Sequence, residues 1–169
     1  ILVCAGDYID CGPKSFEMME WIMNAPSNVV FVRGNHDEEF AAAIDIMKII
    51  CNKAELNPDD AEDSKTLYNA VSLLCKENKN DFFDYYGTIG KLIKEDNVVF
   101  SELCSWADKV TEMPYFYKMT IDDRTCIVVH AGYIESLEDA DTEEKYNNPE
   151  AFYLYARDDA YMCGGIEHG

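Results

Sequence analysis

Apolar runs and helical periodicity alternate over the first fifty residues. Residues 1–5 and 29–32 are continuous apolar runs that stop close to a glycine, as is typical of strands buried on both faces of a parallel sheet. The segments that follow them carry apolar side chains at helical spacing, at Phe16, Met19, Ile22 and Met23 and at Phe40, Ile44, Met47 and Cys51. The pattern predicts β-α-β-α with parallel strands, because such crossovers are right-handed in nearly all proteins. The residues just after the two strands should therefore share one rim of the sheet.

Residues 52–112 are polar and mostly helical, without strand-like runs. We expect one helix capped at 57–60 with Pro58 in its first turn, and another at 101–110 that ends before Met113-Pro114. The first helix would bury a stripe of Leu67, Val71, Leu74 and Cys75. This stretch is interpreted as a helical insertion, at about 52–112, within a single domain that spans residues 1–169. It would cover one side of the crevice at the strand ends.

Strand signals return at 115–121 and 125–130, on either side of the turn Asp122-Asp123-Arg124. The predicted hairpin places His130 at its exit. The chain begins at Ile1 inside an apolar run and ends at Gly169 just after two glycines, so we expect a piece of a longer protein.

Composition narrows the classes of function. The 33 Asp and Glu residues outnumber the 14 Lys and Arg residues, for a net charge of −19, and such a surface repels nucleic acid and anionic lipid. No apolar run approaches the roughly 18 residues that cross a bilayer. The seven cysteines are odd in number and form no CxxC pair, which favours reduced thiols and a cytoplasmic location. We expect neither a nucleic-acid nor a membrane partner.

Polar side chains gather where the predicted strands end. Asp7 and Asp10 follow the first strand, Asn35 and His36 follow the second, and His130 ends a third. Carboxylate and amide oxygens together with an imidazole suit a borderline divalent metal such as Mn, Fe or Zn. Each motif alone has a structural explanation, because a lone histidine at a strand end is more often hydrogen-bonded than a ligand. The three motifs in this order favour a site.

These motifs, Gly6-Asp7-Tyr8-Ile9-Asp10-x-Gly12-Pro13, Arg33-Gly34-Asn35-His36-Asp37 and His130-Ala131-Gly132, resemble three of the five signature blocks of the calcineurin-like metallophosphoesterases. They are most similar to the bacterial branch of the serine/threonine phosphoprotein phosphatases, which also includes symmetrical diadenosine tetraphosphatases. The resemblance implies an α/β sandwich of two mixed β-sheets flanked by helices, with two divalent metal ions at the strand ends. The family's first and last ligand blocks, Asp-x-His and Gly-His-Thr, are absent from the chain, so the resemblance implies a fold that is incomplete at both ends.

The resemblance also implies roles for individual residues. Asp7 would bridge both metals, and Asn35 and His130 would bind the second one. His36 would protonate the leaving oxygen, and Asp10 would orient the His36 ring. Arg157 resembles a phosphate-binding arginine, although a salt bridge with Asp158 or Asp159 is an equal alternative. Cys11 stands where the family usually has a phosphate-binding arginine.

The sequence thus predicts a metal-dependent phosphoesterase that hydrolyses phosphate monoesters by a metal-activated hydroxide. Its substrate would be a phosphorylated protein, a small phosphoester or a nucleotide. Two alternatives stay open at this point, a symmetrical dinucleoside tetraphosphate hydrolase and a non-catalytic binding module that keeps the fold. Because two ligand blocks are missing, we expect residues 1–169 by themselves to be inactive.

Overall fold

The computed structural model describes residues 1–79, 83–133 and 149–156, which divide into two units. Ile1–Gly6, Ser27–Asn35 and Met113–Gly169 make the first, here called the sheet unit. Asp7–Pro26 and His36–Glu112 make the second, here called the helical unit. The chain passes from one unit to the other within the motifs that the sequence singles out, at Gly6-Asp7 and at Asn35-His36.

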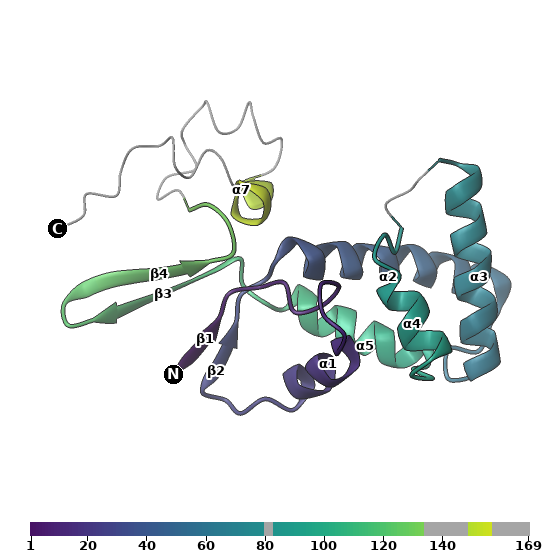
Figure 1. The fold of residues 1–169 in the computed structure, drawn as a ribbon, viewed down its shortest axis with the longest axis horizontal. Coiled ribbons are helices and arrows are strands. Elements are labelled where there is room, and N and C mark those ends of the chain that lie inside the picture. Colours follow the sequence, from purple (N-terminus) through teal and green to yellow (C-terminus); the bar gives the residue numbers. More distant parts are fainter. Residues whose placement is uncertain (80–82, 134–148, 157–169) are drawn as a thin grey trace. The chain divides into compact units, whose positions relative to one another are not determined.

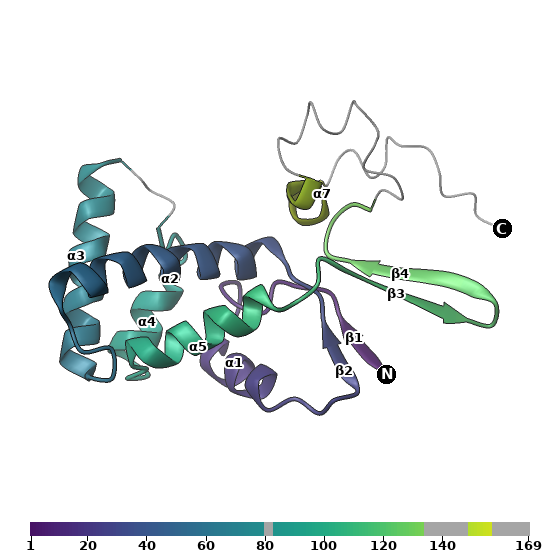
Figure 2. The ribbon, with the colours of Figure 1, turned by 180° about the vertical axis from the view of Figure 1, so that it is seen from behind.

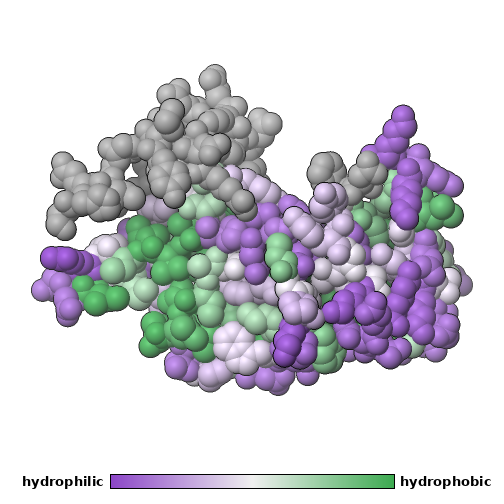
Figure 3. Space-filling view, in the orientation of Figure 1, coloured by the Kyte–Doolittle hydropathy of each residue, from purple (hydrophilic) through white to green (hydrophobic). Residues whose placement is uncertain are grey.

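Two parallel strands open the sheet unit, as the apolar runs predict. β1 (Leu2–Cys4) pairs with β2 (Val29–Phe31), with Leu2 opposite Val29 and Cys4 opposite Phe31 (Figure 1). The ladder continues beyond the strands, because the Val32 N–H donates to the Cys4 carbonyl at 2.9 Å. Both strands therefore end beside the residues that carry the candidate chemistry. β1 and β2 lie under a hydrophobic part of the surface, green in Figure 3.

The predicted hairpin is confirmed. β3 (Phe116–Ile121) and β4 (Arg124–Val129) are antiparallel, with Phe116 opposite Val129 (Figure 1). Asp122 and Asp123 both have positive φ, 49° and 62°, as a two-residue hairpin turn of the primed type requires. Arg124 belongs to β4 rather than to the turn. β4 delivers His130 one residue after its end.

A short helix, α7 (Pro149–Tyr155), packs beside the end of the hairpin. The Ala131 N–H donates to the Tyr153 carbonyl at 3.0 Å, and the Tyr153 ring contacts Phe116 and Tyr133. A Cβ on Gly132 would lie 2.6 Å from the Phe152 ring, so a larger residue there would displace that ring. The segment after β4 is thus tied to α7 by a backbone hydrogen bond and an aromatic cluster.

The helical unit contains α1 (Ser15–Met23), most of α2 (Asn35–Ala54), α3 (Ala61–Glu77), α4 (Thr88–Lys94) and α5 (Phe100–Thr111). α3 contacts α4, and α1 contacts both α4 and α5 (Figures 1 and 2). Its core is built from large apolar side chains that are at most 2% exposed, Met19, Ile22, Ile44, Met47, Leu67, Val71, Leu92, Ile93, Phe100, Leu103 and Trp106.

Within 52–112, the described residues form helices and no strand, as predicted. The details differ. The N-cap of α3 is Asp60, whose carboxylate accepts the Glu62 and Asp63 N–H groups at 2.9 Å. Pro58 therefore lies before the helix and not in its first turn. The predicted stripe ends early, because Leu74 is 45% exposed, and Met23 at the end of α1 is 40% exposed. Both residues lie in the last turn of their helix.

Candidate active site

In the helical unit, the segment after β1 is a tight turn held by a carboxylate. Asp7 and Asp10 have φ of 58° and 76°, a left-handed conformation that is uncommon outside glycine. The Asp37 side chain accepts the Asp7 N–H at 2.9 Å and the Tyr8 N–H at 3.0 Å. Asp37 is only 1% exposed. These two charge-assisted hydrogen bonds stabilise a backbone conformation that otherwise costs of order 1–3 kcal/mol for each strained residue.

The start of α2 supplies the other half of this cluster. The helix begins at Asn35, so His36 and Asp37 lie in its first turn rather than in a loop. The His36 N–H donates to Asp7 Oδ1 at 3.2 Å, while Asp37 holds the Asp7 backbone in return. Carboxylates are favoured at a helix N-terminus, where free N–H groups and the helix dipole present positive charge. The sequence therefore fixes the Asp7 carboxylate against the first turn of α2.

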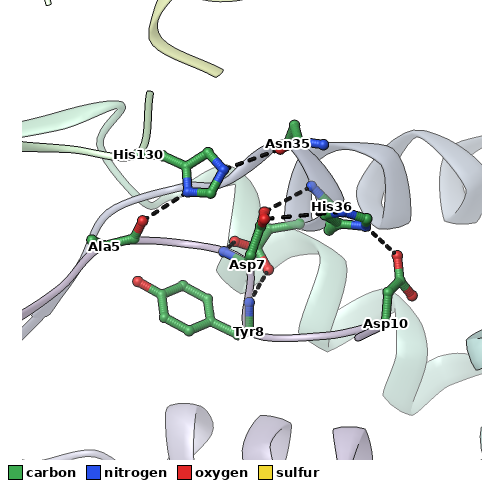
Figure 4. Close-up of polar contacts among 8 residues, drawn as sticks. Ala5, Asp7, Tyr8, Asp10, Asn35, His36 and His130 are labelled. Atoms are coloured by element: carbon green, nitrogen blue, oxygen red, sulfur yellow. Dashed lines mark hydrogen bonds and ion pairs between the residues drawn. The ribbon is translucent and has the colours of Figure 1, made fainter. Parts of the chain in front are cut away.

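His36 lies between two carboxylates (Figure 4). Its Nδ1 is 3.0 Å from Asp10 Oδ2, and its Nε2 is 3.9 Å from Asp7 Oδ2. The side chains of His36 and Asp10 are 9% and 12% exposed. With Nδ1–H donating to Asp10, Nε2 is the ring nitrogen left to exchange a proton with a bound molecule. Sequence reasoning anticipated the pairing of Asp10 with His36, and the geometry brings them together.

Asn35 and His130 meet in the sheet unit. His130 Nε2 is 3.0 Å from Asn35 Oδ1, and His130 Nδ1 is 2.8 Å from the Ala5 carbonyl oxygen (Figure 4). The carbonyl accepts the Nδ1–H, which fixes the ring and the tautomer. Gly6 makes this approach possible, because its φ is 89° and a Cβ there would lie 2.8 Å from His130 Nδ1 and 2.7 Å from Gly34 Cα.

The Asn35 and His130 pair suits a metal ion. Two donors about 2.1 Å from one ion lie roughly 3.0–3.4 Å apart at right or tetrahedral angles, which matches the Asn35 and His130 separation. A backbone carbonyl on the second ring nitrogen is the usual partner of a metal-binding histidine. Among residues 1–79, 83–133 and 149–156, no three His, Cys, Asp or Glu side chains converge into a metal site. The described residues therefore fit two ligands of one ion, one of them an amide oxygen.

The described residues near the turn after β1 bring no guanidinium to grip a phosphate. Cys11 is exposed, and its N–H donates to the Ile9 carbonyl at 3.1 Å. Arg33 is buried and donates to the Met113 carbonyl and the Tyr115 hydroxyl, both at 3.1 Å. These contacts give Arg33 a structural role. Arg157, the predicted phosphate ligand, lies outside the described residues, as do the acidic run at 135–144 and His168.

Sequence reasoning missed the part of three residues in this region of the helical unit. Asp37 was noted only as a further carboxylate, and its hold on the Asp7 backbone depends on turn geometry that no periodicity reveals. Tyr86, from the segment before α4, places its ring centroid 4.9 Å from that of His36. Asp84 accepts hydrogen bonds from Ile89 N, Gly90 N and the Tyr68 hydroxyl at 2.8–2.9 Å. Burial raises the pKa of Asp84 despite these donors.

Comparison with known proteins identifies one family. The sequence model for the calcineurin-like phosphoesterases matches residues 1–161. No curated protein and no solved structure matches the chain. The family match confirms the predicted superfamily and the α/β fold class, and it supports metal-dependent phosphoester hydrolysis in general. In the part of the chain that the structure describes, no helix is both long and apolar enough to cross a membrane.

Proposed function

The chain belongs to the calcineurin-like phosphoesterase family, and we propose that it contributes to the hydrolysis of phosphate monoesters in the manner of the serine/threonine protein phosphatases. One observation carries the proposal. His36 has its Nδ1 on Asp10 and its Nε2 on the side of Asp7, so the imidazole that we propose as proton donor lies beside the carboxylate that we propose as metal ligand. Substrates of this class are phosphorylated proteins and small phosphoesters.

Five residues would carry the chemistry, three as metal ligands and two, His36 and Asp10, in the transfer of a proton to the leaving group. Asp7 would bridge two divalent ions, and Asn35 and His130 would bind the second of them, with Mn, Fe or Zn suited to this oxygen and nitrogen set. When bound, such ions polarise the phosphoryl oxygens and lower the pKa of a bound water. The first ion needs further ligands, which the family's Asp-x-His block would supply.

The chain's own residues position these groups before any substrate arrives. Asp37 fixes the Asp7 backbone, and the Ala5 carbonyl fixes the His130 ring. Asp10 accepts the Nδ1–H of His36, which holds the ring so that Nε2 faces the leaving oxygen. A proton delivered from Nε2 would neutralise the alkoxide as the ester bond breaks, and Asp10 would stabilise the ring while it carries the proton.

Phosphate binding is the weaker part of this site. Cys11 replaces a guanidinium with a thiol, which is a weak single donor. Arg157 is the remaining candidate for a bidentate phosphate ligand. This replacement also supports the second possibility, a relative that kept the fold as a binding module.

The experiment measures phosphate release from phosphopeptides and small phosphomonoesters, and ADP formation from diadenosine tetraphosphate, by the full-length protein with Mn, Fe or Zn. Asp7→Asn removes the bridging charge, and Asp96→Asn, which changes an exposed carboxylate shortly after α4, is the matched control. We expect hydrolysis by the wild type and by Asp96→Asn, and loss of both turnover and bound metal in a folded Asp7→Asn protein. Full activity of Asp7→Asn in excess chelator would overturn the proposal. Exclusive hydrolysis of diadenosine tetraphosphate would assign the alternative activity, and metal binding without any hydrolysis would assign the binding module.

A further inference from the structure

The segment before α4 places two exposed tyrosines next to the proposed proton donor. Tyr86 and Tyr85 are 51% and 70% exposed, and their rings meet edge to face with centroids 5.0 Å apart. The Tyr86 ring also lies against the His36 imidazole, 4.9 Å between centroids with the planes at 58°. Large aromatic side chains are usually covered, so two exposed rings at a reactive imidazole form a surface that a ligand can bury.

Hydrogen bonds tie the segment that carries this surface to α3 and α4. Asp84 accepts two backbone N–H groups from the first turn of α4 and the hydroxyl of Tyr68 on α3. Gly87, with φ of 74°, then turns the chain into α4. The position of Tyr86 is therefore set by hydrogen bonds within the helical unit, and a ligand does not bear the full cost of ordering it.

The pocket beside these rings is acidic. Asp10, Glu39 and Asp84 line it together with Tyr85 and Tyr86, and none of its lining residues is a lysine or an arginine. Three carboxylates in one small pocket disfavour a bound anion, because like charges at close range raise the energy of the complex. A leaving group with phosphates of its own is thus the least suited to this pocket, and a flat uncharged one the best.

Resting on the proposed function, we propose that Tyr86, supported by Tyr85, is a specificity-determining residue that binds a flat, uncharged leaving group such as a phenol. The reason is geometric. If His36 protonates the leaving oxygen, the group attached to that oxygen lies at the His36 ring, and Tyr86 is the aromatic side chain against that ring. The protein then hydrolyses aryl phosphates in preference to nucleoside polyphosphates.

The first experiment compares kcat/KM of the full-length, metal-loaded protein on phenyl phosphate, glycerol phosphate and diadenosine tetraphosphate. An aromatic contact is worth about 0.5–1.5 kcal/mol, so Tyr86→Ala should lower kcat/KM on phenyl phosphate about 3- to 10-fold more than on glycerol phosphate. Tyr86→Phe should keep the wild-type ratio, as should Trp21→Ala, which removes an exposed ring from α1 outside the pocket. Glu39→Gln should raise the activity on diadenosine tetraphosphate relative to phenyl phosphate. An equal loss on both monoesters in Tyr86→Ala would overturn the proposal and leave Tyr86 a positioning residue for His36.

A phosphotyrosyl peptide, assayed beside phenyl phosphate, distinguishes the source of the aryl group. A Tyr86-dependent preference for the peptide indicates a protein substrate, and a Tyr86-dependent preference for phenyl phosphate indicates a small one.

A second measurement separates this inference from the proposed function. Saturation-transfer NMR with phenol and the metal-free protein reports binding without catalysis. We expect transfer in the wild type and in Tyr86→Phe, and its loss in Tyr86→Ala. Equal transfer in wild type and Tyr86→Ala overturns the subsite alone. Absence of hydrolysis with every metal overturns the proposed function and, with it, the role of Tyr86 toward a leaving group.

Discussion

Replacement of His36 by asparagine tests the proton donor directly. Asparagine keeps a polar side chain in the first turn of α2, and the hydrogen bond from the backbone N–H of residue 36 to Asp7 does not depend on the side chain. The substitution therefore removes the imidazole while it leaves the Asp7 turn and its support by Asp37 in place. We expect a folded protein with nearly normal metal content and a lower kcat.

The size of the loss should depend on the leaving group. General acid catalysis typically raises kcat about 10²- to 10⁴-fold. We expect kcat to fall by that factor on an alkyl phosphate, because its alkoxide cannot depart without a proton. Nitrophenolate departs without one, so the loss on nitrophenyl phosphate should stay below about 10-fold. Asp10→Asn should follow the same pattern more mildly. It keeps an oxygen that can accept the Nδ1–H at 3.0 Å but loses the charge, and a charge-assisted hydrogen bond is worth about 1.5–3 kcal/mol in all.

The assay is steady-state kinetics on the two esters with metal content measured on the same samples. Lys48→Met is a control in the same helix, because it removes only the ion pairs of Lys48 with Asp45 and Asp108. It should leave kcat on both esters unchanged. Equal losses of His36→Asn on both esters would show that the imidazole does not donate the proton. An empty metal site in His36→Asn would show that it is a ligand, and the assignment of roles would then be wrong.

Three further predictions rest on single residues. Gly6→Ala should lower the free energy of unfolding, measured by urea titration, by about 2 kcal/mol or more, because it combines a positive φ with a Cβ 2.7 Å from the Gly34 backbone. Gly12→Ala is the control and should leave the free energy of unfolding nearly unchanged, because a Cβ at Gly12 meets open space. Cys11→Arg should raise kcat/KM on phosphomonoesters about 10-fold if the missing guanidinium limits phosphate binding, and an unchanged value would contradict that explanation. Burial raises the pKa of Cys104 to about 11, so at pH 8 its thiol is protonated in the folded protein and should react with disulfide reagents far more slowly than in urea; equal rates would contradict the burial.

Local patterns were enough to predict the framework of the fold. The parallel pair β1 and β2, the helices α1, α2, α3 and α5 and the hairpin β3 and β4 each follow from periodicity and turn residues. α4 was missed because its seven residues include Gly90 and have no long apolar stripe. The exposed Leu74 shows a second limit: periodicity predicts which face of a helix is apolar, but not how far along the helix that face is buried.

In the candidate site too, contacts between short motifs were predicted and contacts that depend on tertiary packing were not. Asp10 with His36, and Asn35 with His130, lie in motifs of fixed spacing at strand ends, and each pair is in contact as expected. Tyr86 is fifty residues from His36 in sequence, and its placement depends on how α4 packs in the helical unit. Contacts of that kind follow from tertiary packing, so the sequence alone predicted a helical insertion at about 52–112 but not which of its side chains lies against His36.

The charge of the candidate site predicts that metal binds before substrate. Asp7, Asp10 and Asp37 bring three carboxylates to the first turn of α2, and the whole chain carries −19. A phosphate dianion brought to this cluster without cations meets like charge at close range, and Cys11 offers no guanidinium to offset it. We therefore expect inorganic phosphate to bind the metal-loaded full-length protein and not the chelator-treated protein in calorimetric titrations at low ionic strength, where surface charge is least screened. Equal phosphate affinity with and without metal would show that arginines outside this cluster, with Arg157 first among them, hold the phosphate by themselves, and that metal binding need not precede substrate.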